Sequence, residues 1–323
     1  MADLVRQMNL KRIPANRKLI GWVFGITGVL SLFFWWRGGS RVGLVLPEFE
    51  PMKISYTVEQ KKVGGEWDAS RTTAKLISQL RQKISQAQGR YGVYVFRLDK
   101  KTGYGIDGDE EMPAASIMKV PIMLAVWQAI EDGRLAWDTK YILQERDKQS
   151  GSGPIEFMDV GTALSVRQLV EEMIKKSDNT APVVLTGLVG REEIEKEIER
   201  LGMEKTDFDK NITTAYDVGL MWRKIYGIKD KEMMALLKDS IYEDRLPAGV
   251  PEEINVLHKV GTGDNVWGDA GIIQCSVLSA QCSTKPFILV ILNEGVDMDE
   301  AKKLVPELTK LIWDFEAGNG KKE

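Results

Sequence analysis

The chain has 323 residues, of which 43% are hydrophobic and 28% are charged, and its formal net charge is −3. This composition is typical of a globular protein with one large domain or two modest ones. A single histidine, His258, and two cysteines, Cys275 and Cys282, leave too few ligands for the common His/Cys metal sites, so we expect neither a metal nor a cofactor. The chain also lacks the Gly-x-Ser-x-Gly motif of many Ser-His-Asp hydrolases. Because it has no basic stripe, we do not expect nucleic acid as a partner.

The N-terminal 42 residues differ in charge from the rest of the chain. They hold seven Lys or Arg against one acid, a net charge of +6, so the other 281 residues together carry −9. Residues 19–36 (LIGWVFGITGVLSLFFWW) contain no charge and would form a helix of roughly 27 Å, close to the thickness of a bilayer's hydrocarbon core. We therefore predict a transmembrane anchor at 19–36. The positive-inside rule then assigns the basic segment 1–18 to the cytoplasm and the body of the chain to the outside of the cell membrane.

Two other interpretations of residues 19–36 are a cleaved signal peptide and a buried core helix. The apolar stretch is long for a signal peptide, and no small-x-small cleavage site follows it. An uncleaved, single-pass anchor is therefore the prediction that we retain.

The rest of the chain is predicted to form a linker at 37–72, a domain at 73–318 and a short tail at 319–323. A helix begins at Thr72, because apolar residues recur from there at helical spacing, and Gly89 ends it. The next segment (YGVYVFRL) has a strand-like pattern and is followed by a turn into a second short strand.

Residues 112–245 have a mostly helical pattern, interrupted by Ser, Thr, Gly and Pro. Ser165 and Gln168 form a capping-box signature at one helix start. Strand patterns then return, at about 255–262, at about 268–278 and at 286–292, and an amphipathic helix over 301–315 ends the domain. This order predicts an α+β fold, in which an antiparallel sheet is built from both ends of the domain, with flanking helices and an inserted helical subdomain.

Three short motifs carry residues suited to nucleophilic chemistry. The first, Ser116-Ile117-Met118-Lys119, begins a predicted helix, and its i, i+3 spacing puts the serine hydroxyl and the lysine ammonium on one face. Backbone N–H groups at a helix start stabilise an oxyanion, and a neutral lysine can accept the serine proton. The second motif is Ser177-Asp178-Asn179, between two helices. The third, His258-Lys259-Val260-Gly261-Thr262-Gly263, ends a strand.

Each motif alone has an ordinary structural interpretation. Ser-x-x-Lys is frequent by chance, Ser-Asp-Asn is a good helix cap, and the third motif fits an edge strand with a solvated lysine. The order and spacing are far less common, since Ser177 lies 61 residues after Ser116 and Lys259 lies 82 residues after Ser177. With the segments MPAASIMK, LSVRQLVEEMIKKSDNTA, NITTAYDVG, DRLPAGVP and DAGII, the chain resembles the class A β-lactamase family, within the active-site serine penicilloyl enzymes, over about residues 73–318.

This resemblance implies a β-lactamase/transpeptidase-like fold and a role for each matching residue. Ser116 resembles the nucleophile, and Lys119 resembles the base that activates it. Ser177 resembles the serine that relays a proton to the leaving nitrogen. Lys259 resembles the strand lysine that fixes the Ser177 proton and attracts the substrate carboxylate.

The resemblance also implies a substrate-binding set. Asn179 resembles a contact to the substrate amide, and the backbone N–H groups of Ser116 and Thr262 would form the oxyanion hole. Arg245 is located where some family members have a carboxylate-binding arginine. Val260 departs from the family pattern, which usually has Thr or Ser there, and Thr262 or Arg245 can compensate for the lost hydroxyl.

A larger departure follows Leu201-Gly202. A class A β-lactamase has there a long loop with a Glu that directs water onto the acyl-enzyme. In this chain, residues 203–210 (MEKTDFDK) lead almost directly into Asn211, and the loop looks deleted. Acylation is therefore expected to be intact and deacylation impaired.

Three functions are compatible with these residues. The first is a membrane-anchored, extracytoplasmic class A β-lactamase-like serine hydrolase that acts on β-lactam amides through a Ser116 acyl-enzyme. The second is a penicillin-binding D,D-peptidase-type enzyme that acts on peptidoglycan peptides. The third is a non-catalytic wall-binding module, against which the complete Ser/Lys/Ser/Lys set argues.

Cys275 and Cys282 bracket the turn between two predicted strands, and an exported domain permits a disulfide. Bridged cysteines need Cα atoms about 4.4–6.8 Å apart, which a hairpin end can provide. A bridge between them is therefore a hypothesis, with two buried free cysteines as the alternative.

Overall fold

The computed structural model describes residues 66–275 and 282–318. The predicted anchor at 19–36, the basic segment before it, nearly all of the linker and the tail lie outside the described residues. Among the helices of the described ranges, none is both long and apolar enough to cross a bilayer.

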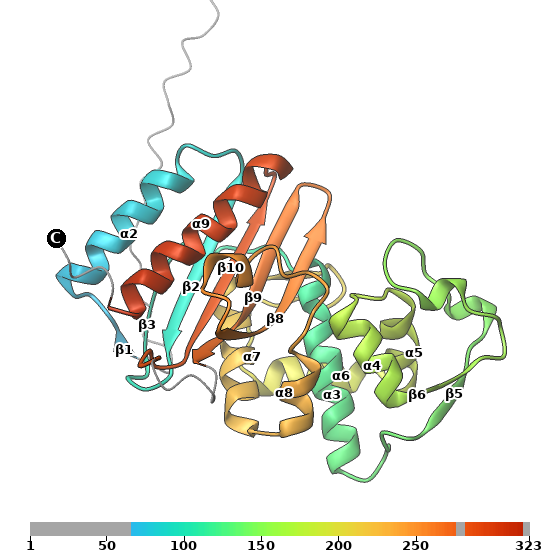
Figure 1. The fold of residues 1–323 in the computed structure, drawn as a ribbon. Coiled ribbons are helices and arrows are strands. Elements are labelled where there is room, and N and C mark those ends of the chain that lie inside the picture. The colour runs from blue at the N-terminus through green and yellow to red at the C-terminus, as the bar shows by residue number, and fades with distance from the viewer. Residues whose placement is uncertain (1–65, 276–281, 319–323) are drawn as a thin grey trace, which may run out of the picture. The chain divides into compact units, whose positions relative to one another are not determined.

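The described domain is organised around a six-stranded sheet of order β1-β3-β2-β10-β9-β8 (Figure 1). Its strands are β1 (Glu66–Trp67), β2 (Arg90–Arg97), β3 (Thr102–Ile106), β8 (Ile254–Gly263), β9 (Val266–Cys275) and β10 (Phe287–Glu294). Strand β1 is parallel to β3, and the other neighbouring pairs are antiparallel. Because the early strand β2 pairs with the late strand β10, the prediction of a sheet built from both ends of the domain is confirmed.

Both faces of this sheet are buried, which explains why β2 has a nearly continuous apolar sequence. Successive side chains of a strand point to opposite faces, so Tyr94 and Phe96 join one hydrophobic core whereas Val93 and Val95 join the other. On the second face, α2 (Arg71–Ile84) and α9 (Met298–Glu316) pack side by side over the sheet (Figure 1).

The helical subdomain follows β3 in sequence and lies on the first face and beyond the β8 edge (Figure 1). Its helices are α3 (Lys119–Glu131), α4 (Val166–Lys175), α5 (Thr180–Val189), α6 (Arg191–Arg200), α7 (Ala215–Ile228) and α8 (Lys231–Leu236). Helix α3 packs against α4, α5 and α6 and is apolar on most sides. The predicted capping box is present at the start of α4, where Ser165 and Gln168 satisfy each other's backbone N–H groups.

Several boundaries differ from the sequence-based expectations. Helix α2 ends at Ile84 instead of continuing toward Gly89, and the short strand β1 lies in what was expected to be linker. The mostly helical region also contains two small sheets, β4 (Met112–Pro113) with β7 (Ile212–Thr213) and β5 (Lys140–Ile142) with β6 (Ala163–Ser165). Strands of two or three residues are too short to produce a detectable alternation in the sequence.

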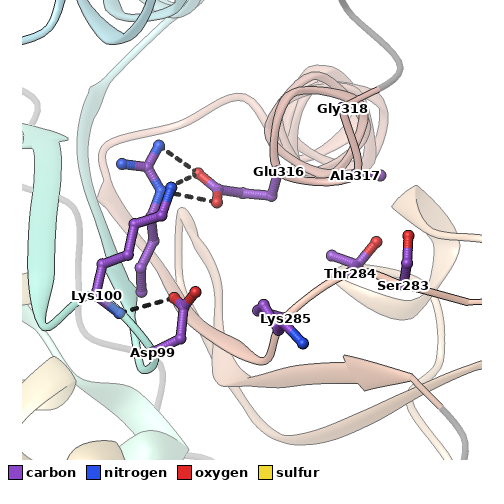
Figure 2. A pocket seen from close by; sticks show the side chains of 9 residues that line it. Asp99, Lys100, Ser283, Thr284, Lys285, Glu316, Ala317 and Gly318 are labelled. Carbon is purple, nitrogen blue, oxygen red and sulfur yellow. Dashed lines mark hydrogen bonds and ion pairs between the residues drawn. The ribbon is translucent and has the colours of Figure 1, made fainter.

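A largely buried ion cluster links strands β2 and β3 to α9 and to Asp68, the residue after β1. Arg97 Nε donates to Glu316 Oε2 at 2.8 Å, and the same guanidinium pairs with Asp68. The Tyr104 hydroxyl donates to Glu316 Oε1 at 2.8 Å. A pocket of about 250 Å³ lies beside the Glu316 carboxylate, lined in part by Asp99, Lys100, Ser283, Thr284 and Lys285 (Figure 2). Its lining includes no residue of the three motifs.

Cys275, at the end of β9, forms a disulfide with Cys282, and their Cα atoms are 5.7 Å apart. The hypothesis of a bridge is confirmed, and the alternative of two free thiols is wrong. The bond closes the segment that connects β9 with β10.

Candidate active site

Ser116 lies in a short 3₁₀ helix, η1 (Ala115–Met118), that leads into α3. The sequence predicted that Ser116 begins an α-helix. In the structure the α-helix begins three residues later, at Lys119. Ala115 has a φ of +47°, a left-handed conformation that is strained for a residue with a Cβ. Strand β8 packs directly on this turn at Gly261, where a Cβ would lie 2.7 Å from the Ala114 carbonyl oxygen. The absent side chain therefore allows the third motif to approach the first.

Lys119 is the buried cation of the first motif. Its side chain is 7% exposed, and Nζ donates to the Ser177 carbonyl oxygen at 2.5 Å and to Asn179 Oδ1 at 2.8 Å. A longer contact of 3.3 Å joins Nζ to Ser177 Oγ. Burial disfavours the ammonium and, against the opposing charge of Asp178, lowers the pKa of Lys119 to about 8. A neutral form of this amine is therefore accessible near physiological pH.

The second motif forms the turn between α4 and α5. Ser177 has a φ of +56°, which turns the chain sharply at this point. Asp178 is fully buried and accepts hydrogen bonds from the backbone N–H groups of Ile155, Thr180 and Ala181. The helix-capping interpretation of the motif thus applies to Asp178, whereas Ser177 and Asn179 contact Lys119.

Lys259 brings the third motif to the same serine. Its Nζ donates to Ser177 Oγ at 2.9 Å and to the Val260 carbonyl oxygen at 3.4 Å. β8 is an edge strand of the sheet, yet Lys259 is only 1% exposed, so the interpretation of a solvated lysine is wrong. Burial, together with the nearby charge of Lys119, lowers the pKa of Lys259 well below its usual value.

Arg245 is close to the third motif but buried behind it. Nη2 donates to Thr262 Oγ1 at 2.5 Å, and Nη1 donates to the carbonyl oxygens of Gly261 and Gly268. The guanidinium carbon lies 3.7 Å from the centroid of the Trp267 ring. Arg245 is 1% exposed whereas Thr262 is exposed, so the side chain accessible from solvent here is that of Thr262 and not the guanidinium.

His258 belongs to a different network from Lys259, because neighbouring residues of a strand point to opposite faces. Its Nδ1 lies 2.9 Å from Asp269 Oδ2, and its Nε2 lies 3.6 Å from Glu243 Oε1. Burial disfavours the imidazolium, but the two carboxylates outweigh it and raise the pKa of His258 to about 9. No sequence pattern indicates the partnership of His258 with Asp269, since the two residues are diagonal neighbours on the paired strands β8 and β9.

The segment at 203–211 is a compact turn between α6 and α7. Asp207 and Ile212 exchange backbone hydrogen bonds across it, and Asn211 accepts one from the Ala114 N–H at 2.9 Å. Its acids are engaged or solvated: Asp207 pairs with Lys210, Asp209 pairs with Arg191, and Glu204 is exposed. The only glutamate of the segment is thus a surface residue.

The three motifs therefore converge as their spacing suggested. Lys119, Ser177 and Lys259 form one buried hydrogen-bonded group that the half-buried Asn179 joins, and Ser116 is half-exposed three residues before Lys119. A lysine of lowered pKa that contacts a serine, which a second lysine also contacts, is an arrangement suited to acyl transfer with proton relay.

Comparisons with known proteins agree with this chemistry. The chain is 23% identical over 271 residues to Beta-lactamase VEB-1 of Pseudomonas aeruginosa, covering 75% of this chain and 91% of that protein. It is 22% identical over 152 residues to the D-alanyl-D-alanine carboxypeptidase DacF of Bacillus subtilis, covering 43% of this chain and 39% of that protein. The solved structure of PBP-A superposes with a TM-score of 0.69 and 20% identity, covering 79% of this chain and 98% of that one. A mutant of PBP-A has been solved as its acyl-enzyme complex with penicillin G.

The model of the β-lactamase enzyme family matches residues 75–315, which include all three motifs. The fold, an antiparallel sheet with helices on both faces, is that of the β-lactamases and transpeptidases. The chain belongs to the β-lactamase enzyme family, whose members are serine hydrolases that form an acyl-enzyme.

Proposed function

We propose that this protein opens β-lactam amides by acylation of Ser116 and releases the acyl group slowly. The observation that carries the proposal is the pair of lysines on one hydroxyl: Ser177 Oγ lies 2.9 Å from Lys259 Nζ and 3.3 Å from Lys119 Nζ. This arrangement links the amine beside the nucleophile to a hydroxyl that can reach a leaving nitrogen.

In the acylation step, neutral Lys119 accepts the Ser116 proton while Oγ attacks the carbonyl carbon of the amide. The backbone N–H groups of Ser116 and Thr262 are the proposed donors to the oxyanion. The C–N bond then breaks, and the nitrogen takes a proton from Ser177. Ser177 recovers a proton from the Lys119 ammonium, and Lys259 keeps the Ser177 oxygen oriented through the hydrogen bond from its Nζ.

The exposed Thr262 hydroxyl is the proposed contact for the substrate carboxylate. A guanidinium can only donate, so Thr262 Oγ1 accepts from Arg245 and keeps its own proton for a bound anion. This indirect role for Arg245 replaces the direct contact implied by the resemblance. It also supplies a hydroxyl where Val260 has none.

The acylation rate constant is expected to fall as pH decreases through about 8, toward a tenfold loss per pH unit. Lys119 gains a proton below its pKa of about 8 and can then no longer accept the one on Ser116. The measurement is the rate of labelling by a fluorescent penicillin between about pH 6 and pH 9 at constant ionic strength. A flat profile across this range would mean that Lys119 is not the base.

A penicillin-binding D,D-peptidase-type activity on peptidoglycan peptides is the second candidate. It is favoured by the short 203–211 turn, which lacks the glutamate of a β-lactamase loop, and by the likeness to DacF and PBP-A. A labelled-penicillin gel and a chromogenic cephalosporin assay separate the functions. Turnover indicates a β-lactamase, a stable covalent band indicates slow release or a D,D-peptidase, and neither result indicates a wall-binding module without catalysis. Release of D-alanine from a peptidoglycan pentapeptide then identifies the D,D-peptidase.

The proposed location is the outer surface of the cell membrane, with residues 19–36 as a single-pass anchor. The support is the uncharged stretch and the +6 charge of the first 42 residues. Protease added to intact spheroplasts should degrade the domain, and detergent-lysed cells give the fully digested reference. Complete protection in intact spheroplasts, with digestion after lysis, would contradict this topology.

A further inference from the structure

Residues 240–245, between α8 and the 3₁₀ helix η4 (Pro247–Gly249), form a segment that we call the strap. Its first half contacts the segment around the α4–α5 turn, which carries Ser177. The Ile241 N–H donates to the Lys175 carbonyl oxygen at 3.2 Å. The Tyr242 hydroxyl lies 3.4 Å from the Lys176 carbonyl oxygen and 3.3 Å from Ser152 Oγ. These contacts fix the two residues that directly precede Ser177.

The second half of the strap contacts strands β8 and β9, and β8 carries Lys259. Glu243 Oε1 lies 3.6 Å from His258 Nε2, and Arg245 donates to Thr262. The next residue, Leu246, donates its N–H to Asp269 Oδ2 at 3.2 Å. These partners lie on either side of Lys259 along β8 and on the neighbouring strand β9.

The strap therefore joins the α4–α5 turn to strand β8. The separation of these two elements sets the 2.9 Å contact between Lys259 Nζ and Ser177 Oγ. Apart from Arg245, the strap is exposed or half-buried. Polar contacts rather than core packing therefore hold it against the α4–α5 turn. We propose that Tyr242 is a positioning residue for the proton relay, and that it acts by holding the Ser177 turn at the correct distance from Lys259. This proposal rests on the acylation function proposed above.

The Tyr242 hydroxyl is the part of the strap best suited to this role. It contacts both Ser152 and Lys176, and the Ser152 carbonyl oxygen in turn accepts the Asn179 N–H at 2.9 Å. One hydroxyl thus supports both residues of the second motif that face Lys119. Proton transfer is sensitive to small errors in position, so a loosened turn slows the chemical step more than it weakens substrate binding.

The test compares Tyr242→Phe with wild type and with Tyr104→Phe. Tyr104→Phe is a matched control, because it also deletes one hydrogen-bonded hydroxyl, the one that donates to Glu316, on a strand separated from β8 by three others. Stopped-flow labelling by a fluorescent penicillin gives the dissociation constant of the first complex and the rate constant of acylation separately. We expect Tyr242→Phe to lower the rate constant about three- to tenfold with an unchanged dissociation constant. Tyr104→Phe should change neither value.

Hydrogen exchange supplies a readout that does not depend on activity. Amides in residues 175–180 and 254–263 should exchange faster in Tyr242→Phe and at the wild-type rate in Tyr104→Phe. A wild type that takes no label would refute the proposed function, and the exchange data would still decide the role of the strap. Unchanged exchange in Tyr242→Phe overturns the positioning role. So does a loss that resides in the dissociation constant alone, which would make Tyr242 a substrate contact.

Discussion

Replacing Ser116 with alanine is expected to abolish covalent labelling of this protein by penicillin, because the substitution removes the oxygen that forms the acyl bond. Replacing Lys119 with alanine should leave labelling possible but about 10²- to 10⁴-fold slower, the usual contribution of a positioned general base. The two results differ in kind: the first variant has no nucleophile, and the second has one that must lose its proton to water. Intact-mass spectrometry and a labelled-penicillin gel measure both.

The controls for these variants separate chemistry from folding. Ser283→Ala removes a hydroxyl from the pocket of Figure 2, away from the motifs, and should label like wild type. Thermal unfolding of Ser116→Ala should match wild type, since Ser116 is half-exposed. Labelling of Ser116→Ala at full stoichiometry would contradict the assignment, and Ser177 would then be the next serine to test.

The sequence predicted the convergence of the motifs better than their local structure. Spacing and order were enough to expect Ser116, Lys119, Ser177 and Lys259 in one site, and the hydrogen bonds join Lys119 and Lys259 at Ser177. The 3₁₀ turn at Ser116 was missed, because the apolar pattern of α3 extends back through Ile117 and hides the change of helix type. The left-handed φ of Ala115 and the close approach of Gly261 in β8 to the Ala114 carbonyl oxygen are not recorded in any local pattern either.

The burial of Lys259 and the role of Arg245 could not be read from the sequence either. A lysine on an edge strand is usually solvated, and here it is covered because the α4–α5 turn contacts β8 from a position 82 residues earlier in the chain. Arg245 was expected to face a substrate, whereas the Trp267 ring and two carbonyl oxygens hold it behind Thr262. Both outcomes depend on contacts between distant segments, which periodicity and composition do not encode.

A long-lived acyl-enzyme is the second large effect that we expect. Hydrolysis of the acyl group needs a water that is held and deprotonated beside the carbonyl, and a positioned base is worth about 10²- to 10⁴-fold in rate. In the turn at 203–211, Lys210 lowers the pKa of Asp207 through a direct hydrogen bond, which makes that carboxylate a weaker base. Asp209 is paired with Arg191, and Glu204 is exposed. None of these three acids is a base held in a dry site.

The turn is also bound to α7 by two hydrogen bonds. Asp217, buried in α7, accepts hydrogen bonds from the Lys205 N–H and the Thr206 hydroxyl, both at 2.9 Å. Asp217 itself has a pKa raised by burial, but both hydrogen bonds hold its carboxylate against the turn. The Asp217 carboxylate is occupied by these hydrogen bonds, so we do not expect it to act as the base for hydrolysis of an acyl group on Ser116.

We therefore expect penicillin to leave an adduct on Ser116 that persists after free penicillin is removed, with a mass equal to protein plus intact penicillin. The measurement is the decay of that mass with time. Slow decay, at least about 100-fold below that of an enzyme with a positioned base, is the predicted result. Rapid decay would instead require a base that the 203–211 turn supplies on acylation, and Glu204→Gln, Asp207→Asn and Asp209→Asn, made one at a time, would identify it. Glu204 is the first of these to replace, because it has no ion-pair partner among the described residues whereas Asp207 and Asp209 must each break one before they can act.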